Sequence, residues 1–247
     1  MKLIAIIAMT LDHIGVFFVV PPVYFLFRVI GRVAFPIICF LIAEGFVRTK
    51  SVRKYILRLS VLAVVSEPIV DKCFYGTFFY SQSQSVLILF VIALFALYIS
   101  KKVDDKYDES NFVRILLRTL IILLTSVIIY VCKTEYGILG FFMIISSYYF
   151  RKKLPVLIAA LLACNFFFLD PIQAFGGVAV IPIILYKGKQ GRKMGLWMYF
   201  YYPIHIIALY IVMVSISTMN SSYIISEKQM TDITAESTEK WGGGHSV

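Results

Sequence analysis

Nine apolar runs, separated by short polar connections, dominate this sequence of 247 residues. The runs cover residues 3–20, 23–46, 54–71, 85–100, 112–131, 136–150, 154–170, 172–186 and 195–217. A helix needs about 20 apolar residues to cross the hydrocarbon core of a bilayer, and it satisfies its own backbone hydrogen bonds there. The pattern therefore predicts an all-α fold, a polytopic transmembrane helical bundle. Because the sixth, seventh and eighth runs are short, the number of spans stays open between eight and ten.

The composition excludes several other classes of protein. Hydrophobic residues make up 60% of the chain and charged residues only 15%. In soluble domains about half of the residues are hydrophobic and about a quarter are charged. The 24 Lys and Arg against 14 Asp and Glu form clusters between the runs, not the basic face with aromatic residues that binds nucleic acid. The four cysteines have no CxxC spacing, so no metal site is predicted. The predicted partner of the apolar runs is the lipid bilayer.

Basic residues occupy alternate connections, and this alternation predicts the orientation of the chain. They are Arg48, Lys50, Arg53 and Lys54; Lys101, Lys102 and Lys106; Arg151, Lys152 and Lys153; and Lys187, Lys189, Arg192 and Lys193. Lys and Arg close to helix ends stay in the cytoplasm. We therefore expect a multi-pass protein of a bacterial cytoplasmic membrane with its N-terminus inside and its C-terminus outside. Residues 1–218 form the predicted transmembrane domain, and 219–247 a polar tail that is predicted to be disordered.

Two histidines lie near the predicted middle of their runs. His13 lies about ten residues into the first run, or roughly 15 Å deep, and His205 lies similarly deep in the ninth run. Histidine can serve as base and acid in one cycle near neutral pH, which suits proton transfer. The alternative is a histidine that only bonds two helices together. Asp12 precedes His13 but points about 100° away from it, so it can pair with an arginine instead.

Arg28 and Arg32 stand four residues apart on one face of the second run. Their anionic partner is either Asp12 or Glu67, or the phosphate or carboxylate of a ligand. Pro36 removes a backbone hydrogen bond from the same helix and favours a kink that opens space for a ligand.

Other charged residues near the run ends favour structural roles. Glu44 is interpreted as a partner of Arg48, and Arg58 as a member of a buried ion pair. Glu67, at the predicted outer end of its run, is a candidate contact for an extracytoplasmic substrate. Glu135 stands at the start of a helix, where an acidic side chain is stabilising. The loop with Lys187, Lys189, Arg192 and Lys193 suits either the phosphates of a donor or simple anchoring in the cytoplasm.

Several motifs together resemble the TraX family, membrane proteins related to the pilin-acetylating protein of conjugative systems and placed near the acyltransferase type three superfamily. The resemblance extends to about residue 215. The motifs are 11–15 (LDHIG), 28–36 (RVIGRVAFP) with 44–46 (EGF), 55–59 (YILRL) to 66–68 (SEP), 136–140 (YGILG), 187–189 (KGK) and 202–205 (YPIH).

The resemblance implies an integral membrane acetyltransferase that moves an acetyl group from cytoplasmic acetyl-CoA, its co-substrate, to the amine or hydroxyl of a peptide, pilin-like or envelope acceptor. It implies His13 as catalytic, with Arg32 near the acyl donor. Asp12 and His205 join this predicted catalytic group. Arg28 and the 187–193 loop are assigned to acetyl-CoA, and Glu67 and Tyr202 to the acceptor.

A competing hypothesis is a proton-coupled transporter or flippase for an anionic substrate. In that case Asp12, His13 and His205 form a proton relay, and the arginines bind the substrate. Such transporters usually have repeated halves with paired broken helices, which this sequence does not show. A third class, a membrane receptor without catalysis, has no positive feature in the sequence. The acceptor and the oligomeric state are not specified by these patterns.

Overall fold

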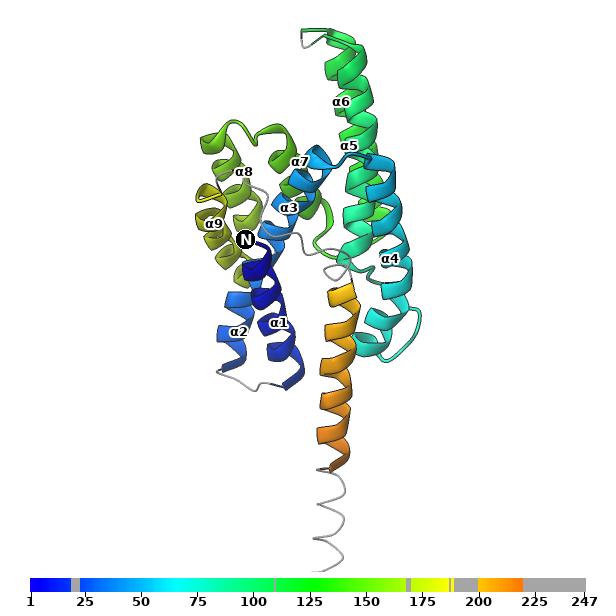
Figure 1. Cartoon of the computed structure of the whole chain (residues 1–247), viewed down its shortest axis with the longest axis vertical. Coiled ribbons are helices and arrows are strands. Elements are labelled where there is room, and N and C mark those ends of the chain that lie inside the picture. The colour runs from blue at the N-terminus through cyan, green and yellow to red at the C-terminus, as the bar shows by residue number, and fades with distance from the viewer. Residues whose placement is uncertain (19–22, 109, 168–169, 187, 189–199, 220–247) are drawn as a thin grey trace, which may run out of the picture. The chain divides into compact units, whose positions relative to one another are not determined.

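The structure is a computed structural model that describes residues 1–18, 23–108, 110–167, 170–186, 188 and 200–219 (Figure 1). The described residues form helices and no strand. The helices are α1 (Lys2–Phe18), α2 (Val23–Arg32), α3 (Ala34–Arg48), α4 (Val52–Tyr75), α5 (Val86–Lys106), α6 (Phe112–Val131), α7 (Gly137–Tyr149), α8 (Leu154–Phe166), the 3₁₀ helix η1 (Pro171–Ala179) and α9 (Val180–Ile184). A further helix covers Phe200–Met219. The predicted all-α fold is confirmed.

Four helical segments are long and apolar enough to cross a membrane, so the chain is a multi-pass membrane protein. They are Val23–Arg48, Val86–Lys106, Phe112–Val131 and Phe200–Met219. The sixth and seventh predicted runs form α7 and α8, each of 13 residues. Such helices are roughly 20 Å long, shorter than a hydrocarbon core of about 30 Å. The short runs identified in the sequence are therefore also short helices.

The second predicted run is divided in two. α2 ends at Arg32 and α3 begins at Ala34, with Val33 between them. Pro36 has no N–H to donate to the carbonyl of Arg32, four residues earlier, and its ring crowds that carbonyl. The interruption that Pro36 was expected to cause is therefore present, just before the proline and directly beside Arg32.

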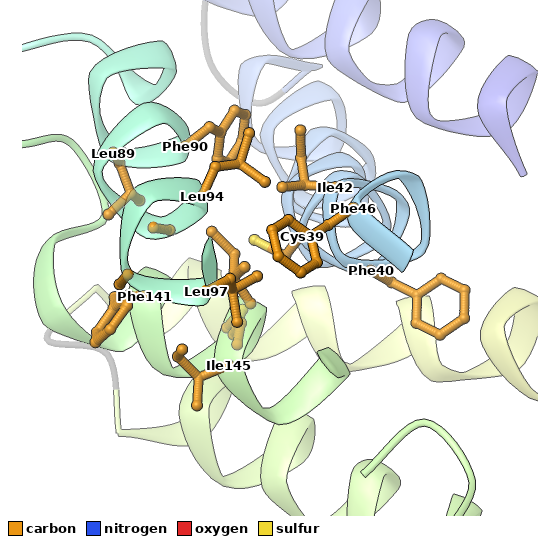
Figure 2. Packing of buried hydrophobic residues seen from close by; sticks show 14 of the residues in the cluster. Cys39, Phe40, Ile42, Phe46, Leu89, Phe90, Leu94, Leu97, Phe141 and Ile145 are labelled. Carbon is orange, nitrogen blue, oxygen red and sulfur yellow. The ribbon is translucent and has the colours of Figure 1, made fainter. Parts of the chain in front are cut away.

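Large buried side chains of α3, α5 and α7 form the main packing centre (Figure 2). Figure 2 shows Cys39 and Phe46 of α3 facing Leu94 and Leu97 of α5, with Phe141 of α7 nearby. α4 and α6 both pack on α5, α8 packs on α7, and α1 packs closely on α2. Because lipid tails are as apolar as these side chains, this association depends on close van der Waals packing more than on the hydrophobic effect.

Two connections pair with each other and form one wall of the site described below. The Gln84 N–H donates to the Lys133 carbonyl at 3.1 Å, and the Glu135 N–H donates to the Gln84 carbonyl at 2.8 Å. Lys133 Nζ also donates to Gln82 Oε1 at 2.5 Å. These bonds fix the start of α5 beside the start of α7.

The chain divides into two compact units, Met1–Ile207 and Ala208–Val247. In the second unit the described residues, 208–219, are helical. The predicted tail lies almost wholly outside the described residues, so its boundary at 218 stays a prediction.

Candidate functional site

A cavity of about 310 Å³ lies in the first unit. Its walls come from α1, α2, α4, the two paired connections and Tyr202. The lining residues are Asp12, His13, Val16, Tyr24, Arg28, Arg32, Val70, Asp71, Phe74, Tyr75, Ser83, Gln84, Ser85, Glu135 and Tyr202. The volume is at the lower end for small-molecule sites. Of the residues predicted from the sequence, Asp12, His13, Arg28, Arg32 and Tyr202 are thus brought to one cavity.

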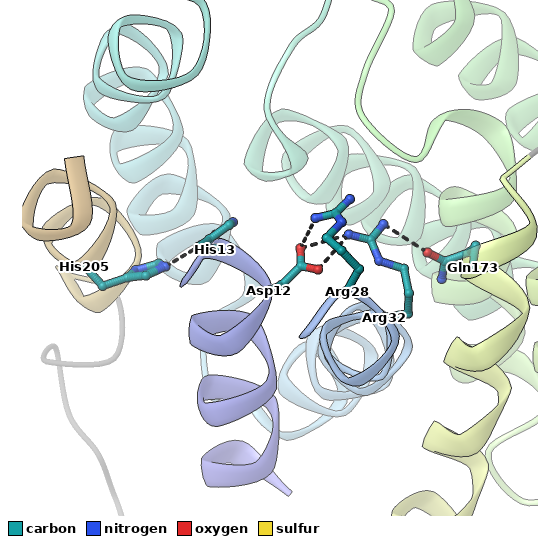
Figure 3. Close-up of polar contacts among 6 residues, drawn as sticks. All are labelled: Asp12, His13, Arg28, Arg32, Gln173 and His205. Carbon is teal, nitrogen blue, oxygen red and sulfur yellow. Dashed lines mark hydrogen bonds and ion pairs between the residues drawn. The ribbon is translucent and has the colours of Figure 1, made fainter. Parts of the chain in front are cut away.

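Asp12 is the partner of both arginines of α2 (Figure 3). Arg28 Nη1 donates to Asp12 Oδ2 at 2.8 Å, and Arg32 Nη2 donates to Oδ1 at 3.0 Å and to Oδ2 at 2.8 Å. The sequence left open whether Asp12, Glu67 or a ligand served this purpose. Two cations now share one buried carboxylate, and the Nε atoms of both arginines are buried without a hydrogen bond. The cluster therefore keeps an excess positive charge and unused donors at the cavity.

Gly31 allows this close contact between α1 and α2. A Cβ atom at Gly31 would lie 2.2 Å from Asp12 Oδ1 and 2.3 Å from Asp12 Cβ, which is far inside van der Waals contact. Gly15 of α1 is similarly crowded, because a Cβ there would lie 2.8 Å from Phe27 Cβ. Small residues at these positions let the two backbones approach, as in other membrane helix pairs. Gly31 is in a motif noted in the sequence, but its role depends on this contact.

A buried polar chain continues from Arg32 into η1 and α8. Arg32 Nη1 donates to Gln173 Oε1 at 3.5 Å, and Gln173 Nε2 donates to Asn165 Oδ1 at 2.9 Å. Asn165 and Gln173 are each only 1% exposed. A second buried acceptor thus orients the Arg32 guanidinium. Sequence reasoning missed Gln173 and Asn165, because an uncharged amide in an apolar run gives no warning of its partner.

The two predicted histidines contact each other. His13 Nδ1 and His205 Nε2 are 2.7 Å apart, and His205 Nδ1 lies 2.8 Å from the Tyr201 carbonyl oxygen (Figure 3). A carbonyl only accepts, so His205 Nδ1 carries the proton that it donates to Tyr201. With both rings neutral, His205 Nε2 then accepts from His13 Nδ1. The proton-free nitrogen of His13 is therefore Nε2, which is the form that a general base requires.

A second contact holds residues 200–207 against α1 within the first unit. The Thr10 hydroxyl donates to the Ile6 carbonyl at 2.8 Å, so the Tyr201 hydroxyl, 2.5 Å away, donates to Thr10 Oγ1. Thr10 and His13 are three residues apart on α1, and Tyr201 and His205 are four residues apart on the other helix. Each pair faces one side of its helix. The His13–His205 contact thus belongs to a two-point attachment.

Glu67 does not line the cavity. Its carboxylate accepts from the backbone N–H of Ser85 at 2.8 Å and from the Ser85 hydroxyl. It therefore fixes the first residue before α5, and Ser85 itself lines the cavity. Glu67 holds the wall in place, so its predicted role as a substrate contact receives no support from this geometry. Asp71 and Glu135, by contrast, line the cavity and were not assigned to the site from the sequence.

The remaining charged residues have structural partners. Glu44 Oε2 accepts from Arg48 Nε at 2.7 Å, as interpreted from the sequence. The predicted buried ion pair of Arg58 is wrong: Arg58 is exposed, and its Nε donates to the Lys54 carbonyl at 3.1 Å. An exposed position on an outward helix face lets the long side chain reach along its own backbone. The loop residues Lys187, Lys189, Arg192 and Lys193 lie outside the described residues.

Comparisons with known proteins agree with the resemblance noted in the sequence. The family model described as TraX protein matches residues 1–213. The chain is also 28% identical, over 236 residues, to a protein of Dichelobacter nodosus named "Probable fimbrial assembly protein FimC, serogroup H1". That alignment covers 85% of this chain and 92% of the relative. No solved structure matches. Because the family model covers the helical bundle and every described residue of the cavity, the chain belongs to the TraX family.

Proposed function

We propose that this protein is an integral membrane acetyltransferase that moves an acetyl group from cytoplasmic acetyl-CoA to the amine or hydroxyl of a peptide, pilin-like or envelope acceptor. The observation that carries the proposal is His13 in a cavity beside two arginines, with its Nδ1 proton directed to His205. Family membership supports the same activity, since the family is associated with pilin acetylation. The name of the Dichelobacter relative supports a role in pilus assembly.

His13 is the proposed general base. For an amine acceptor, the nitrogen lone pair attacks the acetyl carbonyl carbon, a C–N bond forms, and the nitrogen proton passes to His13 Nε2. The C–S bond then breaks, and the thiolate of CoA leaves and takes up the proton from His13. A hydroxyl acceptor follows the same course through its oxygen. A positioned base of this kind contributes about 10²- to 10⁴-fold to the rate.

Arg28 and Arg32 are the proposed source of positive charge for the oxyanion that develops during attack. Asp12 holds both guanidiniums in place, and Gln173 adds a second contact to Arg32. Because these groups are fixed before the reaction begins, little reorganisation is needed as the negative charge appears. Asp12 therefore acts as a positioning residue in this proposal.

The two substrates reach the cavity from opposite sides in this proposal. The cavity wall includes Ser83, Gln84 and Glu135, from connections that the charge pattern assigns to the outside, so the acceptor enters there. The basic cytoplasmic loop of Lys187, Lys189, Arg192 and Lys193 would hold the phosphates of acetyl-CoA. The cavity is small and carries donors for a thioester carbonyl, so it fits the acetyl end of that molecule and not its nucleotide.

The first test compares, by mass spectrometry, envelope peptides and polymers from cells with and without the protein. The second test measures acetyl transfer by the full chain in nanodiscs. We expect an added acetyl group only when the protein is present. His13→Ala should reduce transfer by about 10²- to 10⁴-fold, and His205→Ala should reduce it less, because His13 keeps its base nitrogen. Thermal melting checks that both variants fold. Substrate flux without any acetyl transfer would replace this proposal with the transporter hypothesis.

A further inference from the structure

Asp71 is a buried carboxylate in the cavity wall with one oxygen unused. The residue is 3% exposed. Its Oδ2 accepts from the Tyr80 N–H at 2.7 Å, whereas Oδ1 is buried without a hydrogen bond. A buried carboxylate oxygen without a partner is costly, so a partner is expected during function.

Asp71 differs from Asp12 in the partners of its carboxylate. Asp12 has two arginines on its carboxylate, but no basic side chain in the described part of the chain forms an ion pair with Asp71. The cavity also presents Phe74 and Tyr75, which follow Asp71 by one turn of α4. A free carboxylate oxygen next to aromatic rings is the environment that an organic cation prefers.

Asp71 is close to the proposed base. Phe74 stands three residues after Asp71, about 4.5 Å along the helix axis. The Phe74 ring lies 5.6 Å from the His13 ring, measured between ring centroids. A group held by Asp71 Oδ1 therefore lies in the same small cavity as His13, because both residues line it.

We propose that Asp71 is the residue that binds the ammonium group of an amine acceptor and so determines the affinity of the site for it. This inference rests on the proposed function. An α-amine is mostly protonated at neutral pH. The bound ammonium loses one proton to water before the attack, which frees the lone pair to form the bond to the acetyl carbon. The second proton passes to His13 and then to the leaving thiolate, so the product is a neutral amide.

The variant that isolates the charge is Asp71→Asn. Its side-chain oxygen still accepts from the Tyr80 N–H, so the connection keeps its anchor. The matched control is Asp170→Asn. Asp170 also accepts from a backbone N–H, that of Ile172 at 3.0 Å, but it does not line the cavity.

The probes are an Ala-Gly-Ala amide with a free α-amine and the same peptide with that amine replaced by a hydroxyl. Wild type should bind and acetylate the amine form better. Asp71→Asn should raise the KM for the amine form by about 10- to 100-fold and leave kcat and the hydroxyl form nearly unchanged. Asp170→Asn should change neither. An unchanged KM in Asp71→Asn, or an equal loss for both peptides, would overturn the assignment.

Binding is also measured without acetyl-CoA, which separates this inference from the proposed function. If Asp71→Asn removes a preference for the amine form while no variant transfers acetyl, the cation site stands and the transferase fails. If wild type binds neither peptide but acetylated products are found in cells, the transferase stands and the Asp71 assignment is wrong.

Discussion

Two clusters in this protein have the same composition, one aspartate with two arginines, but different surroundings. Asp12 of α1 pairs with Arg28 and Arg32 of α2 at the cavity. Asp104 of α5 accepts from the Nε atoms of Arg114 and Arg118 of α6. Each cluster joins two neighbouring helices. An aspartate and two arginines are therefore, by themselves, a way to fasten helices together.

The two clusters differ in the other contacts that their guanidinium groups make. At α5 and α6, Arg114 Nη1 donates to the Tyr107 carbonyl, and the Arg118 guanidinium lies 4.9 Å from the centroid of the Tyr149 ring. The Arg118 side chain is 28% exposed, against 18% for Arg28 and 9% for Arg32 at the cavity. At the cavity, both Nε atoms stay unused and His13 is adjacent in sequence to the carboxylate. Spare donors beside a base and a cavity distinguish a candidate site from an anchor.

The largest expected difference between the clusters concerns stability. Asp12→Asn leaves two buried guanidiniums without a charged partner and should lower the free energy of unfolding by about 3–5 kcal/mol. Asp104→Asn should cost less, about 1–3 kcal/mol, because Arg118 is partly exposed and Arg114 keeps the Tyr107 carbonyl. Thermal or denaturant unfolding in detergent measures both changes.

A double substitution sharpens this comparison. Adding Arg28→Met to Asp12→Asn removes one unpaired cation and should recover part of the lost stability. Asp104→Asn should also leave acetyl transfer unchanged, since Asp104 does not line the cavity. Equal losses of unfolding free energy in Asp12→Asn and Asp104→Asn would show that the cavity cluster contributes no more to stability than the Asp104 cluster.

A smaller effect is expected from adding one methyl group at the α1–α2 contact. Gly31→Ala places Cβ against Asp12 and should cost about 1–3 kcal/mol, with a loss of transfer as Asp12 and the arginines shift. Gly177→Ala is the control, because its Cβ would meet only the end of the Leu162 side chain, at 3.0 Å, which can rotate away. Thermal melting and the transfer assay are compared for both. Normal transfer in a folded Gly31→Ala protein would mean that the exact position of Asp12 is unimportant.

The smallest perturbation tests the predicted orientation of the chain, on which the proposed route of the acceptor depends. Single cysteines replace Ser51, Ser81 or Ser237 in a variant whose four native cysteines are replaced by alanine. An impermeant maleimide added from outside should label positions 81 and 237 but not 51, because Arg48, Lys50, Arg53 and Lys54 cluster around 51, whereas only Lys72 lies close to 81. Labelling at 51, or protection at 81, would reverse the orientation and the proposed route of the acceptor.

Particular residues show how far the sequence could be interpreted. The apolar runs predicted the helices because lipid imposes one simple rule, that a spanning backbone must satisfy its own hydrogen bonds. The pairing of the arginines with Asp12 was one of the predicted alternatives, because a charge inside lipid needs an opposite charge. The buried ion pair of Arg58 was predicted wrongly because the position of a residue along an apolar run does not show which face of the helix is exposed. Gln173 and Asp71 were missed because their importance depends on neighbours distant in the chain.

The sequence by itself determined that this is a helical membrane protein of the TraX family with ionisable groups inside its apolar runs. Only the tertiary structure decided which of those groups meet: His13 with His205, Asp12 with two arginines, Glu67 with Ser85 and not with the cavity. The physical reason is the distance, along the chain and in space, over which each interaction acts. Backbone satisfaction and hydropathy act within one helix, whereas hydrogen bonds and ion pairs act over about 3 Å and depend on how helices far apart in sequence pack together.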